Sequence, residues 1–348
     1  MPHKTVLIDD EGHFDSTPTY LFDHAELYRT DPKEAGVTWF SEAHYGLGVT
    51  FGLHSLMGQG ADALAKGKVT LESYKKLRDS FNANAFNAVD LVEYVIANGM
   101  RYLELNVRGD DGFCLFNTKT TDFNCAAAPA HRDLLAELAS VCEYHGVGLC
   151  LEYSLGRHLT HPHAPGSLQP AENVSFEEYF DFTAQQINEL MTQFGPIAAI
   201  CLEGIDQMHD LKPEVFDCNA YYRMIHSLQP QTLIAFQHGL NGEEDYFRVN
   251  DEFPEEDAKN AGFIHKQSVK PVQVRLSMTP DNLGYAPEHS GHHLNQEQVW
   301  KALKSAAEKQ HNLLINTALL PDGSMDGEDV ETLIAIGERI EKHGFPRA

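Results

Sequence analysis

The chain has 348 residues and a formal net charge of −25, which argues against nucleic acid and anionic membrane surfaces as partners. Apolar residues make up 42% of it, enough for a sizeable core, and no run of about 18 apolar residues predicts a transmembrane helix. The first residues lack the apolar core of a secretory signal, and the six cysteines show neither zinc-type nor redox spacing. We therefore expect a cytoplasmic protein without a metal or other cofactor.

Helical and strand-like segments alternate along most of the chain. Residues 1–35 are expected to form an N-terminal extension and residues 36–348 a single domain. Helices are predicted over 89–97, 132–144, 176–193, 298–309 and 327–343, and strands over 102–107, 147–153, 197–202, 233–236, 272–278 and 312–320. The acidic segment 241–259 is predicted to be a long loop at the rim of an active site. This alternation predicts an α/β fold with a parallel sheet, most simply a (β/α)8 TIM-like barrel.

The segment 99–124 is the most informative one. A buried strand breaks at Gly109 and delivers Asp110 and Asp111 into a loop that continues with Gly112 and Phe113. Catalytic side chains of α/β barrels follow the C-terminal ends of the strands. Asp110 is therefore a candidate catalytic residue, whereas Asp111 is expected to be structural.

Taken together, the motifs at residues 39–55, 108–113, 132–134, 152–155, 200–204 and 312–316 resemble those of the α-L-fucosidases, glycoside hydrolase family 29, over about residues 38–345. Residues 39–55 resemble the family's Trp-Phe and Phe-Gly-Ile-Phe-Ile-His-Trp-Gly-Leu-Tyr-Ser, and residues 108–113 its Lys-His-His-Asp-Gly-Phe. Residues 132–134 and 152–155 match Arg-Asp-Leu and Tyr-Tyr-Ser-Leu, residues 200–204 resemble Ile-Trp-Phe-Asp-Gly, and residues 312–316 resemble Asn-Leu-Leu-Leu-Asn. The resemblance implies a barrel that hydrolyses glycosidic bonds.

The departures from the family fall in its sugar pocket. Thr50 and Phe51 replace a His-Trp pair, Gly109 and Asp110 replace His-His, and Leu283 replaces the Trp of Ser-Trp-Gly-Tyr. Because the family's residues hold fucose, the resemblance implies a substrate other than plain fucose. Thr50 and Phe51 stay candidate substrate-binding residues.

Two further carboxylates end predicted strands. Glu203 stands at the position of the family's nucleophilic aspartate, and Glu152 ends the neighbouring predicted strand in place of a family tyrosine. Both are candidate catalytic residues, because paired carboxylates serve glycoside hydrolysis. Side chains alternate along a strand, so either Glu152 or Tyr153 points inward, and Tyr153 is a candidate for substrate binding.

Three candidate substrate-binding residues come from later strands. Arg275 lies in a buried strand where the family has a glutamate, and Gln237 and His238 end the preceding predicted strand. A buried arginine needs a carboxylate partner. That partner is either an acidic, uronic sugar or the protein's own Glu203.

The sequence thus favours a glycoside hydrolase of small carbohydrates, including acidic ones. Two alternatives stay open, namely a uronate lyase with His238 or Tyr153 as base and a catalytically degenerate glycan-binding barrel. Histidines cluster in 158–163 and 289–293, but both clusters lie in Pro/Gly-rich loops and predict no metal site. The oligomeric state also stays open, a homo-oligomer included.

Overall fold

The computed structural model describes residues 16–211, 216–237, 239–250, 270–279 and 283–346. Within these residues, parallel strands form a single eight-stranded sheet with the order β5-β4-β3-β2-β1-β8-β7-β6. The strands are β1 (Tyr45–Thr50), β2 (Tyr102–Arg108), β3 (Gly148–Ser154), β4 (Ala199–Glu203), β5 (Leu233–Ala235), β6 (Phe247–Asn250), β7 (Val272–Ser277) and β8 (Asn312–Ala318).

The two outermost strands of this order, β5 and β6, meet and close the sheet. Ala235 forms a parallel bridge with Tyr246, and the backbone N–H of Arg248 donates to the carbonyl of Gln237 at 2.8 Å. The predicted (β/α)8 TIM-like barrel is therefore confirmed.

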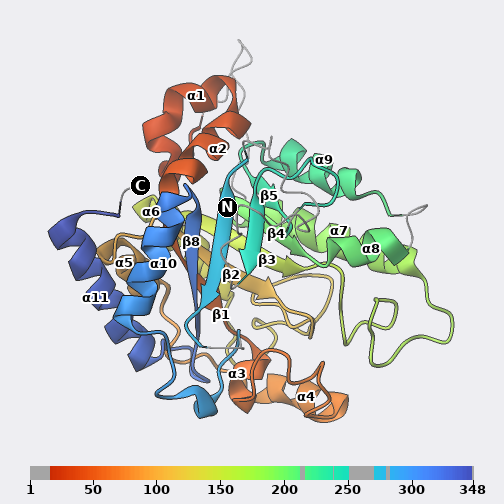
Figure 1. The fold of residues 1–348 in the computed structure, drawn as a ribbon. Helices are drawn as coiled ribbons and strands as arrows, with labels where there is room; N and C mark the ends of the chain where they lie inside the picture. Colours follow the sequence, from red (N-terminus) through yellow and green to blue (C-terminus); the bar gives the residue numbers. More distant parts are fainter. Residues whose placement is uncertain (1–15, 212–215, 238, 251–269, 280–282, 347–348) are drawn as a thin grey trace.

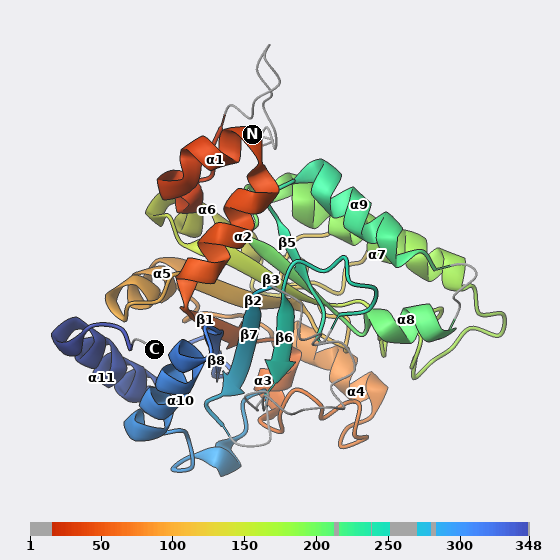
Figure 2. The ribbon, with the colours of Figure 1, turned by 45° about the horizontal axis from the view of Figure 1, so that its top comes forward.

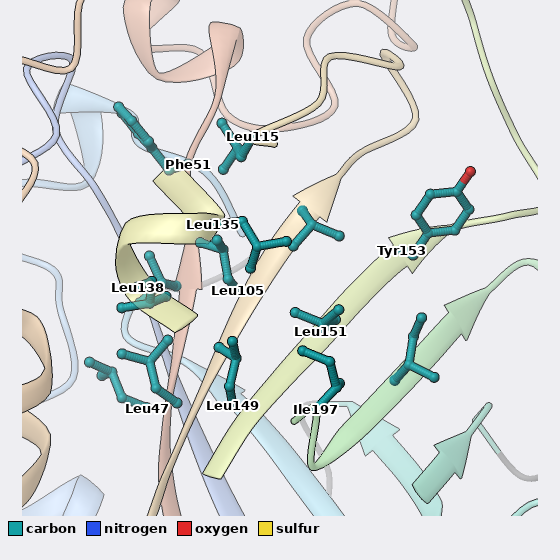
Figure 3. Close-up of a cluster of buried hydrophobic side chains, with 14 of the residues drawn as sticks. Leu47, Phe51, Leu105, Leu115, Leu135, Leu138, Leu149, Leu151, Tyr153 and Ile197 are labelled. Carbon is teal, nitrogen blue, oxygen red and sulfur yellow. The ribbon is translucent and has the colours of Figure 1, made fainter. Parts of the chain in front are cut away.

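Helices surround the barrel and cover the outer faces of its strands (Figures 1 and 2). They are α3 (Leu53–Met57), α4 (Leu71–Lys76), α5 (Ala88–Ala97), α6 (Leu134–His145), α7 (Phe176–Gln193), α8 (Ile205–Leu211), α9 (Cys218–Leu228), α10 (Gln296–Glu308) and α11 (Gly327–His343). Asp133 begins α6 because its carboxylate accepts the backbone N–H of Ala136. Figure 3 shows Leu135 and Leu138 of this helix facing leucines on the outer face of β2 and β3. No helix among the described residues is long and apolar enough to cross a bilayer.

The N-terminal end of the barrel is closed by η1 (Thr19–His24), α1 (Ala25–Thr30) and α2 (Pro32–Ala43), which lie opposite α3 and α4 (Figure 1). Trp39 and Phe40 of α2 are buried, and the Phe40 ring lies 4.4 Å from that of Tyr246. The described part of the predicted N-terminal extension contributes Leu21 and Tyr28 to the same apolar cluster. The candidate catalytic residues are therefore expected at the opposite end of the barrel, where the strands have their C-terminal ends.

The prediction of a loop over 241–259 was wrong for residues Phe247–Asn250, which form β6. Residues 251–259 lie outside the described part of the chain. The strand escapes sequence analysis because it has four residues, and its inward positions carry Arg248 and Asn250 rather than apolar side chains.

Candidate active site

A cluster of charged side chains fills the barrel above its apolar closed end. Glu104 on β2, Glu152 on β3 and Glu203 on β4 supply three carboxylates, and Arg248 on β6 and Arg275 on β7 supply two guanidinium groups. The side chains meet because alternate residues of each strand point into the barrel. We call these five residues the lumen cluster.

Arg248 is the centre of the lumen cluster and is fully buried. Its Nη2 pairs with Glu104, and its Nη1 lies 2.7 Å from Glu152 Oε2 and 3.6 Å from Glu203 Oε1. Its Nε donates to Gln273 at 2.9 Å. One guanidinium therefore links carboxylates from three adjacent strands across the barrel.

Glu152 is held as an anion. It accepts hydrogen bonds from Arg248, from Arg275 and from the side-chain amide of Asn106 at 2.6 Å. Burial alone would raise the pKa of Glu152, but Arg275 and Arg248 outweigh it and lower this pKa. A carboxylate in this state is unsuited to donate a proton, so Glu152 anchors the two guanidinium groups.

Glu203 is the lumen-cluster carboxylate with the most solvent access. Its side chain is 22% exposed, compared with 4% for Glu104 and 8% for Glu152. The Cys201 thiol donates to Glu203 Oε1 at 3.3 Å, and the Glu203 carbonyl accepts the N–H of Leu155 at 2.8 Å. The end of β4 is thereby fixed while the carboxylate reaches the barrel mouth.

Asp110 lies beyond the end of β2 with its side chain 39% exposed. The hydroxyl of Ser154 donates to its Oδ1, and Arg157 Nη1 lies 3.5 Å from its Oδ2. Ser154 is the register partner of Glu203 on the neighbouring strand. Ser154 therefore connects the two partly exposed candidate carboxylates, since it donates to Asp110 and is the register partner of Glu203.

The carboxylate partner of Arg275 in the structure is Glu152, which was not among the partners considered from the sequence. Arg275 Nη1 pairs with Glu152, and its Nε donates to Asn250 at 3.1 Å. Glu203 instead faces Arg248. The proposed Arg275–Glu203 ion pair was therefore wrong, because Glu152 occupies the position next to the guanidinium.

Of the remaining substrate-binding candidates, Thr50 and Gln237 lie at or just after the ends of strands, whereas Phe51 and Tyr153 lie behind the strands. The hydroxyl of Thr50 donates to Asn316 at 3.0 Å at the end of β1, and Gln237 follows β5 with a φ of 24°. His238 lies outside the described residues.

Phe51 and Tyr153 lie behind the strands, in the core between the barrel and its helices (Figure 3). The Phe51 ring packs 5.2 Å from that of Phe81, and Tyr153 lies under the guanidinium of Arg108 at 4.1 Å. Strand alternation explains the placement, since their neighbours point inward. The structure gives no support to substrate binding by these two residues.

Asp111 has the structural environment expected of it. Its carboxylate is buried and accepts hydrogen bonds from the Tyr74 hydroxyl at 2.6 Å and the Phe113 N–H at 3.1 Å. Burial raises the pKa of Asp111 to about 6, although both hydrogen bonds oppose the rise.

One group among the described residues has the spacing of metal ligands. The ligand atoms of His293, Asp326 and Glu328 lie within 4.8 Å of one another. His293 Nδ1 already pairs with buried Asp329 at 2.6 Å, which accounts for the position of the imidazole. We assign no metal to this group.

Comparison with known proteins identifies the family. A family model described as Alpha-L-fucosidase matches residues 28–345. The chain belongs to the α-L-fucosidase family. Over 157 residues it is 29% identical to α-L-fucosidase 1 of Arabidopsis thaliana, covering 44% of this chain and 29% of that protein. Over 160 residues it is 28% identical to a putative α-L-fucosidase 1 of Oryza sativa subsp. japonica, covering 44% and 28%. The match thus spans less than a third of either plant protein.

Solved structures of α-L-fucosidases share the fold. α-L-fucosidase isoenzyme 1 from Paenibacillus thiaminolyticus superposes with a TM-score of 0.80 at 22% identity, covering 91% of this chain and 79% of that one. Unliganded AlfC from Lactobacillus casei gives a TM-score of 0.75 at 23% identity, covering 88% and 98%.

Sequence analysis missed part of this family member's lumen cluster. Arg248 and Glu104 were not candidates, nor were the supporting amides of Asn106 and Gln273. A usable signal exists in β2, where Glu104 and Asn106 alternate with Leu103 and Leu105. Polar residues at alternate positions of a buried strand indicate an occupied interior face.

Proposed function

We propose that this protein is a glycoside hydrolase that releases a neutral sugar, with Glu203 attacking or stabilising the anomeric carbon. Family membership and the position of Glu203 at the end of β4 support the proposal. The observation that carries it is the partial exposure of Glu203 beside two buried carboxylates. A carboxylate at this place opposes the positive charge of an oxocarbenium-like transition state.

Asp110 is the proposed proton donor to the leaving group. Glu152 is unsuited because its two arginines favour the anion. Asp110 is 39% exposed, and it accepts a hydrogen bond from Ser154, the register partner of Glu203 on the neighbouring strand. A carboxyl group that alternates between acid and base needs such access to solvent and substrate.

A neutral sugar is favoured over a uronic one because both guanidinium groups of the lumen cluster already face protein carboxylates. The uronate-lyase alternative loses one of its two candidate bases, because Tyr153 lies outside the barrel interior. The alternative of a catalytically degenerate glycan-binding barrel required an ion pair between Glu203 and Arg275. Arg275 pairs with Glu152 instead.

The test is a panel of nitrophenyl and natural glycosides assayed with wild type, Glu203→Gln and Asp110→Asn. We expect Glu203→Gln to lose at least about 1,000-fold in kcat/KM on every substrate. Asp110→Asn should lose much more on natural glycosides than on nitrophenyl glycosides, because a nitrophenolate leaves without a proton. Glu297→Gln, which changes a 76% exposed carboxylate on α10, is the matched control and should stay active. Activity retained in Glu203→Gln, or no activity of folded wild type on any glycoside, would overturn the proposal.

A further inference from the structure

A cavity of about 670 Å³ lies beside the barrel mouth. It is formed by the connections that follow β1, β2 and β3 together with α4 and α7. Its volume falls within the usual range for small-molecule sites, roughly 300–1,000 Å³. Its walls include the side chains Lys75, Thr120, Phe123, His161, Gln169 and Phe182. We call it the side pocket.

Lys75 gives the side pocket a cation without a carboxylate partner among the described residues. Its Nζ contacts the side-chain oxygen of Gln169 at 3.4 Å. The neighbouring cations differ, since Lys76 pairs with Glu72 at 2.7 Å and Arg78 Nη1 lies 3.3 Å from Asp122. The three carboxylates that line the pocket, Glu72, Asp79 and Asp122, each pair with Lys76 or Arg78, so the ammonium group of Lys75 keeps donors for an anion.

A buried positive charge stands behind the side pocket. Arg108 is fully buried and donates to the Tyr179 hydroxyl at 3.2 Å and to the Ser154 carbonyl. Within the described part of the chain, no carboxylate lies within 4.0 Å of its guanidinium. Gln186 accepts from Arg108 at 3.3 Å and donates to Thr120 at 2.8 Å, which reaches the pocket wall. Charge in such a low-dielectric layer acts over a longer range than on the surface.

The side pocket also offers a partly apolar surface made of two rings tilted by 45° to each other. The rings of His161 and Phe182 lie 4.6 Å apart. Burial, His163 and Arg108 lower the pKa of His161 to about 4, so its imidazole is neutral at pH 7 and can exchange hydrogen bonds with hydroxyl groups. An aromatic face beside hydrogen-bonding groups suits a sugar ring, which has apolar C–H faces and a polar rim.

One loop forms the wall between the side pocket and the barrel mouth. The N–H of Leu159 donates to the Asp110 carbonyl at 2.7 Å, and the hydroxyl of Thr160 donates to the Asp111 carbonyl at 3.0 Å. Thr160 lines the pocket, while Asp110 borders the mouth.

We propose that the side pocket binds a sugar residue carrying a carboxylate or a sulfate, with Lys75 as the residue that contacts the anion. The placement of this residue on the leaving-group side of the scissile bond rests on the proposed hydrolase function. The binding itself does not depend on that function. Together the two sites would take a neutral terminal sugar and an acidic remainder of the same glycan.

The test is calorimetric titration of the full chain in about 0.15 M salt, where surface charges are screened beyond about 8 Å. The probes are trigalacturonate, galactose 6-sulfate and neutral galactotriose. We expect at least one anionic probe to bind, with galactotriose at least tenfold weaker than the better anion. Preference for trigalacturonate or for galactose 6-sulfate identifies the group as carboxylate or sulfate.

Variants assign the binding to the side pocket. Lys75→Ala should lower the affinity for the anionic probe at least tenfold. Lys75→Arg keeps the charge and should retain most of the affinity. Lys66→Ala removes a 60% exposed lysine outside the pocket and should bind as wild type does. Glu203→Gln should also keep the affinity, which separates this proposal from the hydrolase proposal. Absence of binding by both anions, equal affinity for galactotriose, or unchanged affinity in Lys75→Ala would overturn it.

Discussion

Replacing Arg248 with methionine tests whether the lumen cluster supports the barrel. Arg248 is fully buried, and its partners Glu104 and Glu152 are 4% and 8% exposed. Removing one partner of such a buried pair costs about 3–5 kcal/mol, because the other charge is left without compensation. Arg275 still faces Glu152 in the variant, so Glu104 carries most of this cost. The loss is a substantial part of a typical total stability of about 5–15 kcal/mol.

Urea unfolding followed by tryptophan fluorescence measures the loss. Lys76→Met is the matched control. The Lys76–Glu72 pair has the same 2.7 Å length as the Arg248–Glu152 pair, but the side chains of Lys76 and Glu72 are 69% and 80% exposed. The control should lose less than about 0.5 kcal/mol. Adding Glu104→Gln to Arg248→Met should restore at least about 1 kcal/mol, since it removes the uncompensated charge. Equal losses in the two single variants, or no restoration by Glu104→Gln, would refute this reasoning.

Two further predictions concern the loop after β2. The pKa of Asp111 is about 6 in the folded chain against about 3.8 in the unfolded one, so the folded state binds the proton more tightly. The contribution of Asp111 to wild-type stability should therefore fall by about 2.4 kcal/mol as the pH rises from 4 to 7. Asp111→Asn should lack this fall in unfolding experiments, and parallel pH profiles would contradict the assignment. Gly112 has a φ of 82°, and a Cβ there would overlap the imidazole of buried His158. Gly112→Ala should therefore lose at least about 2 kcal/mol in thermal or urea unfolding, and a loss below about 0.5 kcal/mol would show that the loop adapts.

The barrel could be predicted from sequence because its long strands have strong local signals. Segments such as 102–107 and 312–320 combine apolar runs with flanking helices, and both form strands of the sheet. The four-residue β6 has no such signal. Its place in the sheet depends on pairing with β7 and on the closure next to β5, which are long-range contacts.

The candidate site could be predicted only in part, for a related reason. Glu203 and Glu152 were identified because each ends a predicted strand, and both lie in the lumen cluster. The partner of Arg275 could not be chosen, because which side chains meet across a closed barrel depends on strand tilt and register. Phe51 follows β1 directly and lies buried in the core behind the strands, a placement that its sequence position alone did not show.

The apolar closure at the N-terminal end has a consequence for how the lumen cluster responds to a bound molecule. Phe40 and Tyr246 belong to an apolar cluster beneath the charges, with their rings 4.4 Å apart, and Glu203 is the lumen-cluster carboxylate with the greatest exposure. A sugar seated at the barrel mouth would displace water there and lower the effective dielectric constant around Glu203. Every Coulomb interaction in the barrel would then strengthen together, without movement of a side chain. A bound sugar would therefore itself strengthen the electric field that acts on it.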